Sequence, residues 1–273
     1  MTTLNAIILG TIQGFGEFLP ISSSGHLVLI PWLLKFKDPG LAFDVMLHLG
    51  TTLSLIAYFW EDFYNLILGF LRSIFLRRIK DDLYARLAWL IIIATIPAGI
   101  VGFMMDDIIE TTFRNPLWIS FFLISIALYL WFTDKSAKKN KELSAMSVNI
   151  AIIIGLYQCL ALIPGVSRSA ITIIAALICG FNRESSARFS FLISMPIILG
   201  AGLLKIPDII NNGLDVYTLG NLIIGFSISA ITGYIAIKFL LSFVKKHSLN
   251  IFVYYRIILG LLIFALYYLR NSV

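Results

Sequence analysis

Residues 11–26 read TIQGFGEFLPISSSGH, and this stretch decides the fold. It places Glu17, Pro20, His26 and a run of three serines inside a region that is otherwise apolar. Proline ends helices and serine favours the start of the next one, so the stretch predicts a break between two short helices. A second break, PGVSRSAIT at 164–172, adds an arginine. Each break divides an apolar region into halves that are too short to cross a bilayer.

The composition is that of an integral membrane protein. Of the 273 residues, 59% are hydrophobic and 13% are charged, and the mean hydropathy is +0.92. Soluble domains average about 25% charged residues. The net charge of +6 does not predict nucleic-acid binding, because the Lys and Arg residues lie in short loops between apolar segments.

Six apolar segments are long enough to cross a hydrocarbon core of about 30 Å as helices. They are 41–60, 87–105, 117–133, 187–204, 221–241 and 252–270. The two broken regions, 4–34 and 148–181, predict re-entrant helix–loop–helix hairpins, which occur where protein buries them or where they line a wet cavity. We therefore expect an all-α polytopic membrane protein with about six transmembrane helices and two re-entrant hairpins.

The charges of the loops predict the orientation. Segments 72–86, 134–142 and 245–247 are basic, whereas 106–115 and 205–221 are not. Basic loops stay on the cytoplasmic side of a membrane. The spans then alternate correctly only if both broken regions re-enter, the first from outside and the second from inside. Both termini would lie outside.

An internal repeat relates the two halves of the chain. Four residues of the first half recur 145 positions later, so that Gly10, Gln13, Ser22 and Ser24 match Gly155, Gln158, Ser167 and Ser169. Each half then contains one hairpin and three spans. Because three is odd, the halves point in opposite directions, which makes the repeat an inverted one. We expect a single membrane domain, 1–273, with a first repeat at 1–133 and a second at 148–273.

The two breaks together predict a phosphate pocket. Gln13 and Glu17 share one helix face, and the serines after Pro20 stand where the next helix begins. Helix N-termini bind anions through free N–H groups and the helix dipole, and inverted repeats bring two of them together near the bilayer midplane. The remaining candidate residues are Ser22, Ser23, Ser24 and His26 in the first break and Gly165, Ser167, Arg168, Ser169 and Thr172 in the second.

Structural interpretations compete with this one. Serines in membrane helices often only bond backbone carbonyls or pack helices together. An arginine such as Arg168 costs about 3 kcal/mol at mid-membrane, so it is a functional candidate, although an ion pair with Glu17 would also explain it. His26 alone is equally well a hydrogen-bonded structural residue. Asp44 and His48, four positions apart, are either cavity-lining or ordinary interfacial residues.

QGFGEFLPISSSGH and PGVSRSAIT closely resemble the two signature regions of the undecaprenyl-diphosphate phosphatase family, the bacitracin-resistance proteins. FDVMLHLGT at 43–51 and SARFSFLISMP at 186–196 extend the resemblance over the chain. It implies hydrolysis of undecaprenyl diphosphate to the monophosphate and phosphate in the bacterial plasma membrane, with the active site facing outward. That reaction recycles the lipid carrier for cell-wall peptidoglycan and gives bacitracin resistance. The resemblance also implies a divalent cation, Mg²⁺ or Ca²⁺. Gln13 departs from the pattern, since many relatives have glutamate there.

The residues and the resemblance lead to one hypothesis for the mechanism. Arg168, with Ser167, Ser169 and the amides of the hairpin, holds the terminal phosphate and stabilises its charge. Glu17 either binds the cation or acts as general base. The nucleophile is the Ser23 hydroxyl or a water molecule, and His26 shuttles the proton.

Two other classes of protein share features with this sequence. A transporter or flippase of a lipid phosphate would need a similar pocket, since many transporters bind anions where broken helices of inverted repeats meet. Another superfamily of lipid phosphatases is suggested by SSSGH and SRS, but its Lys-x6-Arg-Pro motif is absent from the sequence. We expect undecaprenyl diphosphate and membrane lipid as partners, and the sequence makes no prediction of the oligomeric state.

Overall fold

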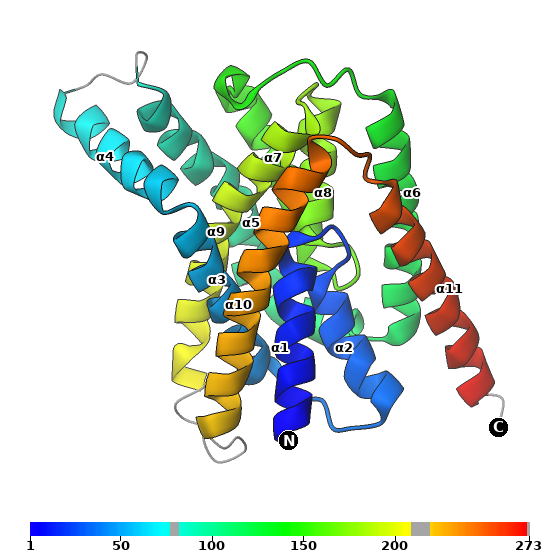
Figure 1. Ribbon diagram of the computed structural model, residues 1–273. Helices are drawn as coiled ribbons and strands as arrows, with labels where there is room; N and C mark the ends of the chain where they lie inside the picture. The colour runs from blue at the N-terminus through cyan, green and yellow to red at the C-terminus, as the bar shows by residue number, and fades with distance from the viewer. Residues whose placement is uncertain (77–81, 209–218, 272–273) are drawn as a thin grey trace.

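The computed structural model describes residues 1–76, 82–208 and 219–271. Within these ranges the chain is helical, without a strand, and a single isolated bridge joins Lys141 to Phe181. Figure 1 shows the arrangement of the helices. In chain order they are α1 (Thr3–Phe18), α2 (Ser23–Leu34), α3 (Leu41–Tyr58), α4 (Trp60–Leu76), α5 (Leu83–Thr112), α6 (Pro116–Ser136), the 3-10 helix η1 (Leu143–Ala145), α7 (Val148–Cys159), the 3-10 helix η2 (Leu160–Leu162), α8 (Arg168–Ile178), α9 (Arg183–Asp208), α10 (Leu219–Val244) and α11 (Asn250–Asn271).

Five helices among the described residues are long and apolar enough to cross a membrane. They are Leu83–Met105 in α5, Pro116–Ser136 in α6, Arg183–Leu203 in α9, Leu219–Val244 in α10 and Asn250–Arg270 in α11. Each corresponds to one of the spans expected from the sequence. The protein is therefore an all-α polytopic membrane protein, as predicted.

The predicted span at 41–60 is part of a longer, bent helix pair that, counted as one span, is the sixth candidate among the described residues. It comprises α3 and the first residue of α4, and the apolar segments of these helices, Ala42–Tyr58 and Trp60–Phe75, meet at a bend of 82°. Acidic residues favour a helix N-terminus, and Glu61 and Asp62 open α4, so a second helix begins where the sequence was expected to leave the membrane. The predicted loop 72–86 consequently includes the last turn of α4 and the first of α5, and its residues 77–81 lie outside the described ranges.

Two further predicted connections include helical residues. Segment 106–115 is helical as far as Thr112, because α5 continues beyond its apolar part. In segment 205–221, α9 runs to Asp208 and α10 begins at Leu219, and residues 209–218 lie outside the described ranges.

Both predicted breaks are present. α1 and α2 have 16 and 12 residues and are separated around Pro20, while α7 and α8 have 12 and 11 residues and are separated by η2 and the turn at Gly165. In Figure 1, α1 and α8 lie in the middle of the molecule, between α3 and α10 on one side and α6 and α11 on the other. The side from which each hairpin enters the membrane stays a prediction, and so does the inverted repeat.

The first hairpin is held by close helix packing. A Cβ atom at Gly10 of α1 would lie only 2.8 Å from the carbonyl oxygen of Gly225 in α10, so only glycine permits this approach. At the other end of α1, the Phe18 ring packs edge-on against Phe191 of α9, with ring centroids 5.3 Å apart. The C-terminal part of α1 is thus enclosed by protein, which is the condition for a helix that ends inside a membrane protein.

Candidate functional site

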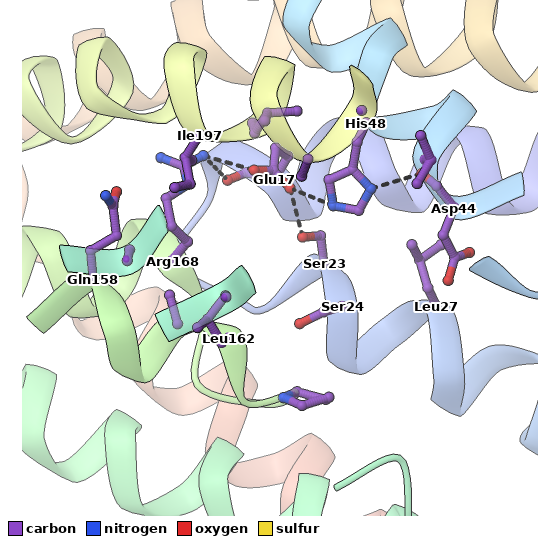
Figure 2. A pocket seen from close by; sticks show the side chains of 18 of the residues that line it. Glu17, Ser23, Ser24, Leu27, Asp44, His48, Gln158, Leu162, Arg168 and Ile197 are labelled. Carbon is purple, nitrogen blue, oxygen red and sulfur yellow. Dashed lines mark hydrogen bonds and ion pairs between the residues drawn. The ribbon is translucent and has the colours of Figure 1, made fainter. Parts of the chain in front are cut away.

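A cavity of about 300 Å³ lies where the two breaks meet. Most of its wall is apolar, and Figure 2 shows Glu17 between Arg168 on one side and His48 on the other. The first half of the chain contributes Glu17, Ser23, Ser24, Asp44, His48 and Arg114, and the second half contributes Gln158 and Arg168. The predicted convergence of the two breaks on one pocket is therefore observed for five residues of the predicted site region: Glu17, Ser23, Ser24, Pro164 and Arg168.

Glu17 is the centre of the polar group. The Ser23 hydroxyl donates to Glu17 Oε2 at 2.8 Å, and Gln13 Nε2 donates to the same oxygen at 3.1 Å. The Arg168 guanidinium donates to the other oxygen, Oε1, at 2.8 Å. Glu17 is only 5% exposed, so these charge-assisted bonds form in a site that is largely screened from water.

His48 adds a fourth partner to Glu17. Its Nδ1 donates to the carbonyl oxygen of Asp44 at 2.7 Å, which leaves Nε2 facing Glu17 Oε2 at 3.4 Å. A neutral imidazole that donates from Nδ1 is an acceptor at Nε2, as is the carboxylate oxygen opposite. His48 Nε2 is therefore the ring nitrogen that can exchange a proton with Glu17. Asp44 and His48 both line the cavity, so the structure supports the first of their two interpretations.

Arg114 provides a second guanidinium to the cavity. It lies just after α5, with its Nη2 2.9 Å from Asp38 and 3.6 Å from Asp44. The ion pairs fix the side chain at the cavity wall. Sequence analysis missed this residue, although a lone arginine next to an apolar span was a usable signal.

Arg168 is fixed by two elements besides α8. Its Nη1 donates to the Ser190 carbonyl oxygen of α9 at 3.0 Å, and its Nη2 also approaches the Glu17 carbonyl oxygen at 3.4 Å. Behind it, the Thr172 hydroxyl lies 2.7 Å from the Ser190 hydroxyl. The ion pair between Arg168 and Glu17, which was the structural alternative, exists. It lies on the cavity wall, so the pair is also within reach of a ligand in the cavity.

The two turns before α2 and α8 have the same local geometry. Ser22 and Ser167 are both in a left-handed backbone conformation, with φ of 77° and 75°, and each side chain accepts a hydrogen bond from the backbone N–H three residues later at 3.3 Å. A non-glycine residue at positive φ costs about 1 to 3 kcal/mol, and such residues concentrate at functional sites. Both serines therefore shape the helix starts, and neither lines the cavity.

Several other predicted residues also lie behind the cavity wall. Ser169 is fully buried, and its hydroxyl donates to the Leu19 carbonyl oxygen at 3.1 Å, which joins the second turn to the first. The Thr172 hydroxyl donates to the Arg168 carbonyl oxygen within α8, and Gly165 lies in the turn before that helix. Gln13 is buried behind Glu17. Ser24 does line the cavity.

His26 points away from the cavity. Its Nδ1 donates to the Ser22 carbonyl oxygen at 2.7 Å, and its Nε2 lies 2.6 Å from the hydroxyl of Tyr255 in α11. Both ring nitrogens are thus occupied on the far side of α2. The structure brings His48, and not His26, up to Glu17.

Arg256 of α11 is a further residue that sequence analysis missed. It is fully buried, and its hydrogen bonds go to backbone carbonyl oxygens of both breaks and of α6. An arginine inside the apolar segment 252–270 was the available signal, because such a residue is costly unless it has partners.

The donors around Glu17 suit a hard cation in part. Within the described ranges there is no group of three or more His, Cys, Asp and Glu side chains that could hold a metal ion. However, Gln13 Oε1 is a buried oxygen without a hydrogen-bond partner, next to the Glu17 carboxylate. Mg²⁺ is commonly held by one or two protein oxygens together with substrate phosphates and water. Gln13 and Glu17 fit that pattern.

Comparison with known proteins assigns the family. A family model described as "Bacitracin resistance protein BacA" matches residues 6–262. The chain belongs to this family. An undecaprenyl-diphosphatase of Moorella thermoacetica is 46% identical over 271 residues, which cover 99% of this chain and 100% of that protein. An undecaprenyl-diphosphatase of Geotalea daltonii is 48% identical over 263 residues, covering 96% and 97%. A third relative of the same description, from Methanosphaera stadtmanae, is 46% identical over 268 residues, covering 95% and 96%.

The family match covers both breaks and every helix that lines the cavity. The resemblance inferred from the motifs is thereby confirmed. The match assigns no role to any single residue, so the roles of Glu17, Ser23, His48 and Arg168 rest on the geometry of the cavity.

Proposed function

We propose that this protein is an integral membrane phosphatase that hydrolyses undecaprenyl diphosphate to undecaprenyl phosphate and phosphate. The observation that carries the proposal is the hydrogen-bonded group of Ser23, Glu17 and Arg168, which joins a hydroxyl, a carboxylate and a guanidinium from both breaks in one cavity. The relatives named undecaprenyl-diphosphatase support the choice of substrate.

Ser23 is the nucleophile that the geometry favours. Its hydroxyl already donates to Glu17 at 2.8 Å, which is the arrangement of a nucleophile with its general base. Glu17 takes the proton as Ser23 Oγ forms a bond to the terminal phosphorus. The bond from that phosphorus to the bridging oxygen breaks, and undecaprenyl phosphate leaves. Water then cleaves the phosphoserine and releases phosphate. Direct attack by a water bound to Glu17 is the alternative.

Arg168 supplies the positive charge at the transferred phosphoryl group. Phosphoryl transfer depends mainly on positioning and on stabilising the equatorial oxygens. The guanidinium is held by Ser190 and Glu17, yet it has five N–H groups, so the others remain for the phosphate. Arg114, at the same cavity, is placed to bind the second phosphate of the diphosphate.

His48 takes over the role predicted for His26. When His48 is neutral, its Nε2 is an acceptor 3.4 Å from Glu17 Oε2, so a proton that Glu17 accepts from Ser23 can pass to His48. The same histidine can return it to the leaving phosphate. The chain thus contains a proton path of three residues.

We include a divalent cation, Mg²⁺ or Ca²⁺, in the proposal. In the alternative in which Glu17 is a cation ligand and not the general base, Glu17 and Gln13 Oε1 would hold it. A bound cation neutralises negative charge on the phosphate oxygens. Glutamine in place of a second carboxylate leaves the site with one fewer negative charge, so we expect weaker cation binding than with glutamate at this position.

We expect a lipid substrate to enter the cavity from the outer face of the membrane. Its apolar wall, formed by residues such as Leu27, Leu162 and Ile197, suits a prenyl chain. Asp44 and Arg114, at the start of α3 and after α5, lie on the wall toward the less basic connections. The basic segment 134–142 lies toward the other end of α6, so the positive-inside rule supports an outward-facing site in a bacterial plasma membrane.

The test is phosphate release from undecaprenyl diphosphate by purified protein in detergent. We expect release by the wild type and at least about 100-fold less by Glu17→Ala and Arg168→Ala. Detergent removes any gradient, so release also separates an enzyme from a flippase. A correctly folded wild type that releases no phosphate from any prenyl diphosphate, with and without Mg²⁺ or Ca²⁺, would contradict the proposal.

Ser23→Ala separates the two nucleophiles. If serine attacks, acid quenching traps a phosphoenzyme in the wild type that is missing in this variant. Ser24→Ala, which changes the neighbouring hydroxyl of the same cavity, is the matched variant and keeps the phosphoenzyme. Full activity in Ser23→Ala would establish attack by water.

A further inference from the structure

Arg256 binds both breaks at once. Its Nη1 donates to the carbonyl oxygen of Pro20 at 3.2 Å, and its Nη2 donates to those of Gly165 at 2.8 Å and Val166 at 3.2 Å. Pro20 and Gly165 are 145 positions apart, the same separation that relates Ser22 to Ser167. One guanidinium therefore bonds corresponding carbonyls of the two turns.

The remaining donors of Arg256 fix it to a rigid support. Its Nε donates to the carbonyl oxygen of Leu123 at 3.1 Å, and its Nη2 also approaches that of Phe122 at 3.3 Å. Both residues lie in α6, the helix against which α11 packs. The side chain is fully buried, so no bulk water competes for these bonds. A helix break leaves carbonyls without intrahelical partners, and inside a membrane protein they need another donor.

The two turns lead directly into the reacting groups. Ser23 follows Pro20 by three residues, and Arg168 follows Gly165 by three. Whatever sets the separation of the two turns consequently sets the position of the Ser23 hydroxyl relative to the Arg168 guanidinium. Glu17 bridges the same two side chains on the cavity side, while Arg256 bridges their turns from behind.

We propose that Arg256 is a positioning residue that aligns Ser23 with the Arg168 phosphate site by holding the two turns at a fixed separation. The inference rests on the proposed phosphatase function and deepens it. Arg256 acts through the backbone and does not touch the substrate. A misplacement of about 1 Å between reacting groups can cost about 100-fold in rate, so its removal should lower kcat more than it raises KM.

The test compares Arg256→Lys with Arg270→Lys. Arg270 is the matched control, because it lies on the same helix and also donates to two backbone carbonyls, those of Trp32 and Leu33, but at the far end of α2. Lysine has three donors from one atom and cannot span five carbonyls in three segments. We expect Arg256→Lys to lower kcat about 10- to 100-fold with KM within about threefold, and Arg270→Lys to change neither by more than about twofold.

Two readouts distinguish alignment from general support. In a double-mutant cycle, Arg256→Lys should lower kcat less than about threefold in an Arg168→Lys background. The reason is that the alignment of Ser23 with the Arg168 guanidinium is already lost in that background. Hydrogen exchange should accelerate at both turns, 19–23 and 163–168, and not along α3 or α9. Additive effects in the cycle, or exchange that rises throughout the protein, would overturn the proposal.

If Arg256→Lys does not fold, Arg256→Gln takes its place in the same measurements, since it removes the buried charge and keeps two N–H donors. Failure of both variants to fold would also overturn the proposal, because the residue would then serve folding alone. An active wild type with an equally active Arg256→Lys refutes the alignment role and leaves the phosphatase function intact. An inactive wild type refutes the function itself.

Discussion

Replacing Arg168 with lysine tests whether its forked geometry is needed. The guanidinium donates from Nη2 to Glu17 Oε1 at 2.8 Å and from Nη1 to the Ser190 carbonyl oxygen at 3.0 Å, and it has N–H groups left for a phosphate. A lysine ammonium is a single point and keeps the charge without the fork. We assume that it retains the contact with Glu17 and loses one charge-assisted hydrogen bond to the phosphoryl group.

One such bond contributes about 1.5 to 3 kcal/mol. At about 1.36 kcal/mol per tenfold change, Arg168→Lys should lower kcat/KM roughly 10- to 160-fold. The assay is phosphate release from undecaprenyl diphosphate in detergent, together with a thermal unfolding curve for each variant. Arg188→Lys is the control, since Arg188 also pairs with a carboxylate, Asp62 Oδ1 at 2.6 Å, but lies outside the cavity.

We expect Arg188→Lys to stay within about twofold of the wild type, because a partly exposed ion pair contributes little. The reasoning is refuted if folded Arg168→Lys retains more than half of the wild-type kcat/KM. A drop in thermal stability with unchanged activity per folded molecule would show that Arg168 and Glu17 form a purely structural pair.

Three further predictions concern neighbouring groups. His48→Gln should lower kcat by about 100-fold, and His26→Gln by much less, because only His48 faces Glu17. A pH–rate profile of each variant checks this, and a larger loss of kcat in His26→Gln would assign the proton transfer to His26. Arg114→Gln should raise KM about tenfold with kcat within about threefold if Arg114 binds the second phosphate. Initial-rate kinetics measure both constants, and an unchanged KM would show that Arg114 does not bind the substrate. Asp134→Asn should destabilise the protein by about 2 kcal/mol without changing kcat, because Asp134 is buried and bonds Arg183, Lys139 and the Leu249 N–H far from the cavity. Thermal unfolding in detergent tests this, and an unaltered midpoint would contradict it.

The elements that depend on local signals were predictable. Pro20 and the serines after it determine a break by themselves, and so do Pro164, Gly165 and Ser167, because proline and N-cap preferences act over a few residues. Both breaks are where the sequence placed them. The same local chemistry also identified Glu17, Ser23 and Arg168, which are the residues that meet in the cavity.

The features that depend on distant partners were not predictable. His26 is oriented by Tyr255, 229 positions away, and nothing near His26 in the sequence indicates that contact. The bend between α3 and α4 has no proline or glycine to mark it, since Phe59 and Trp60 read as the end of one apolar run. The acceptors of Arg256 lie in distant segments, so its position in an apolar helix indicates that it needs partners but not which ones.

The bond from Arg256 to Pro20 spans 236 positions, which has a consequence for biosynthesis. Translation delivers α11 to the translocon after all the other described helices, so the nascent first turn waits for its donor while most of the polypeptide is already inserted. Until that moment the Pro20 carbonyl must find a temporary partner, such as water or a lipid head group. The enzyme would therefore become competent only when α11 docks, and a ribosome that stalls before α11 would leave an inserted but inactive product.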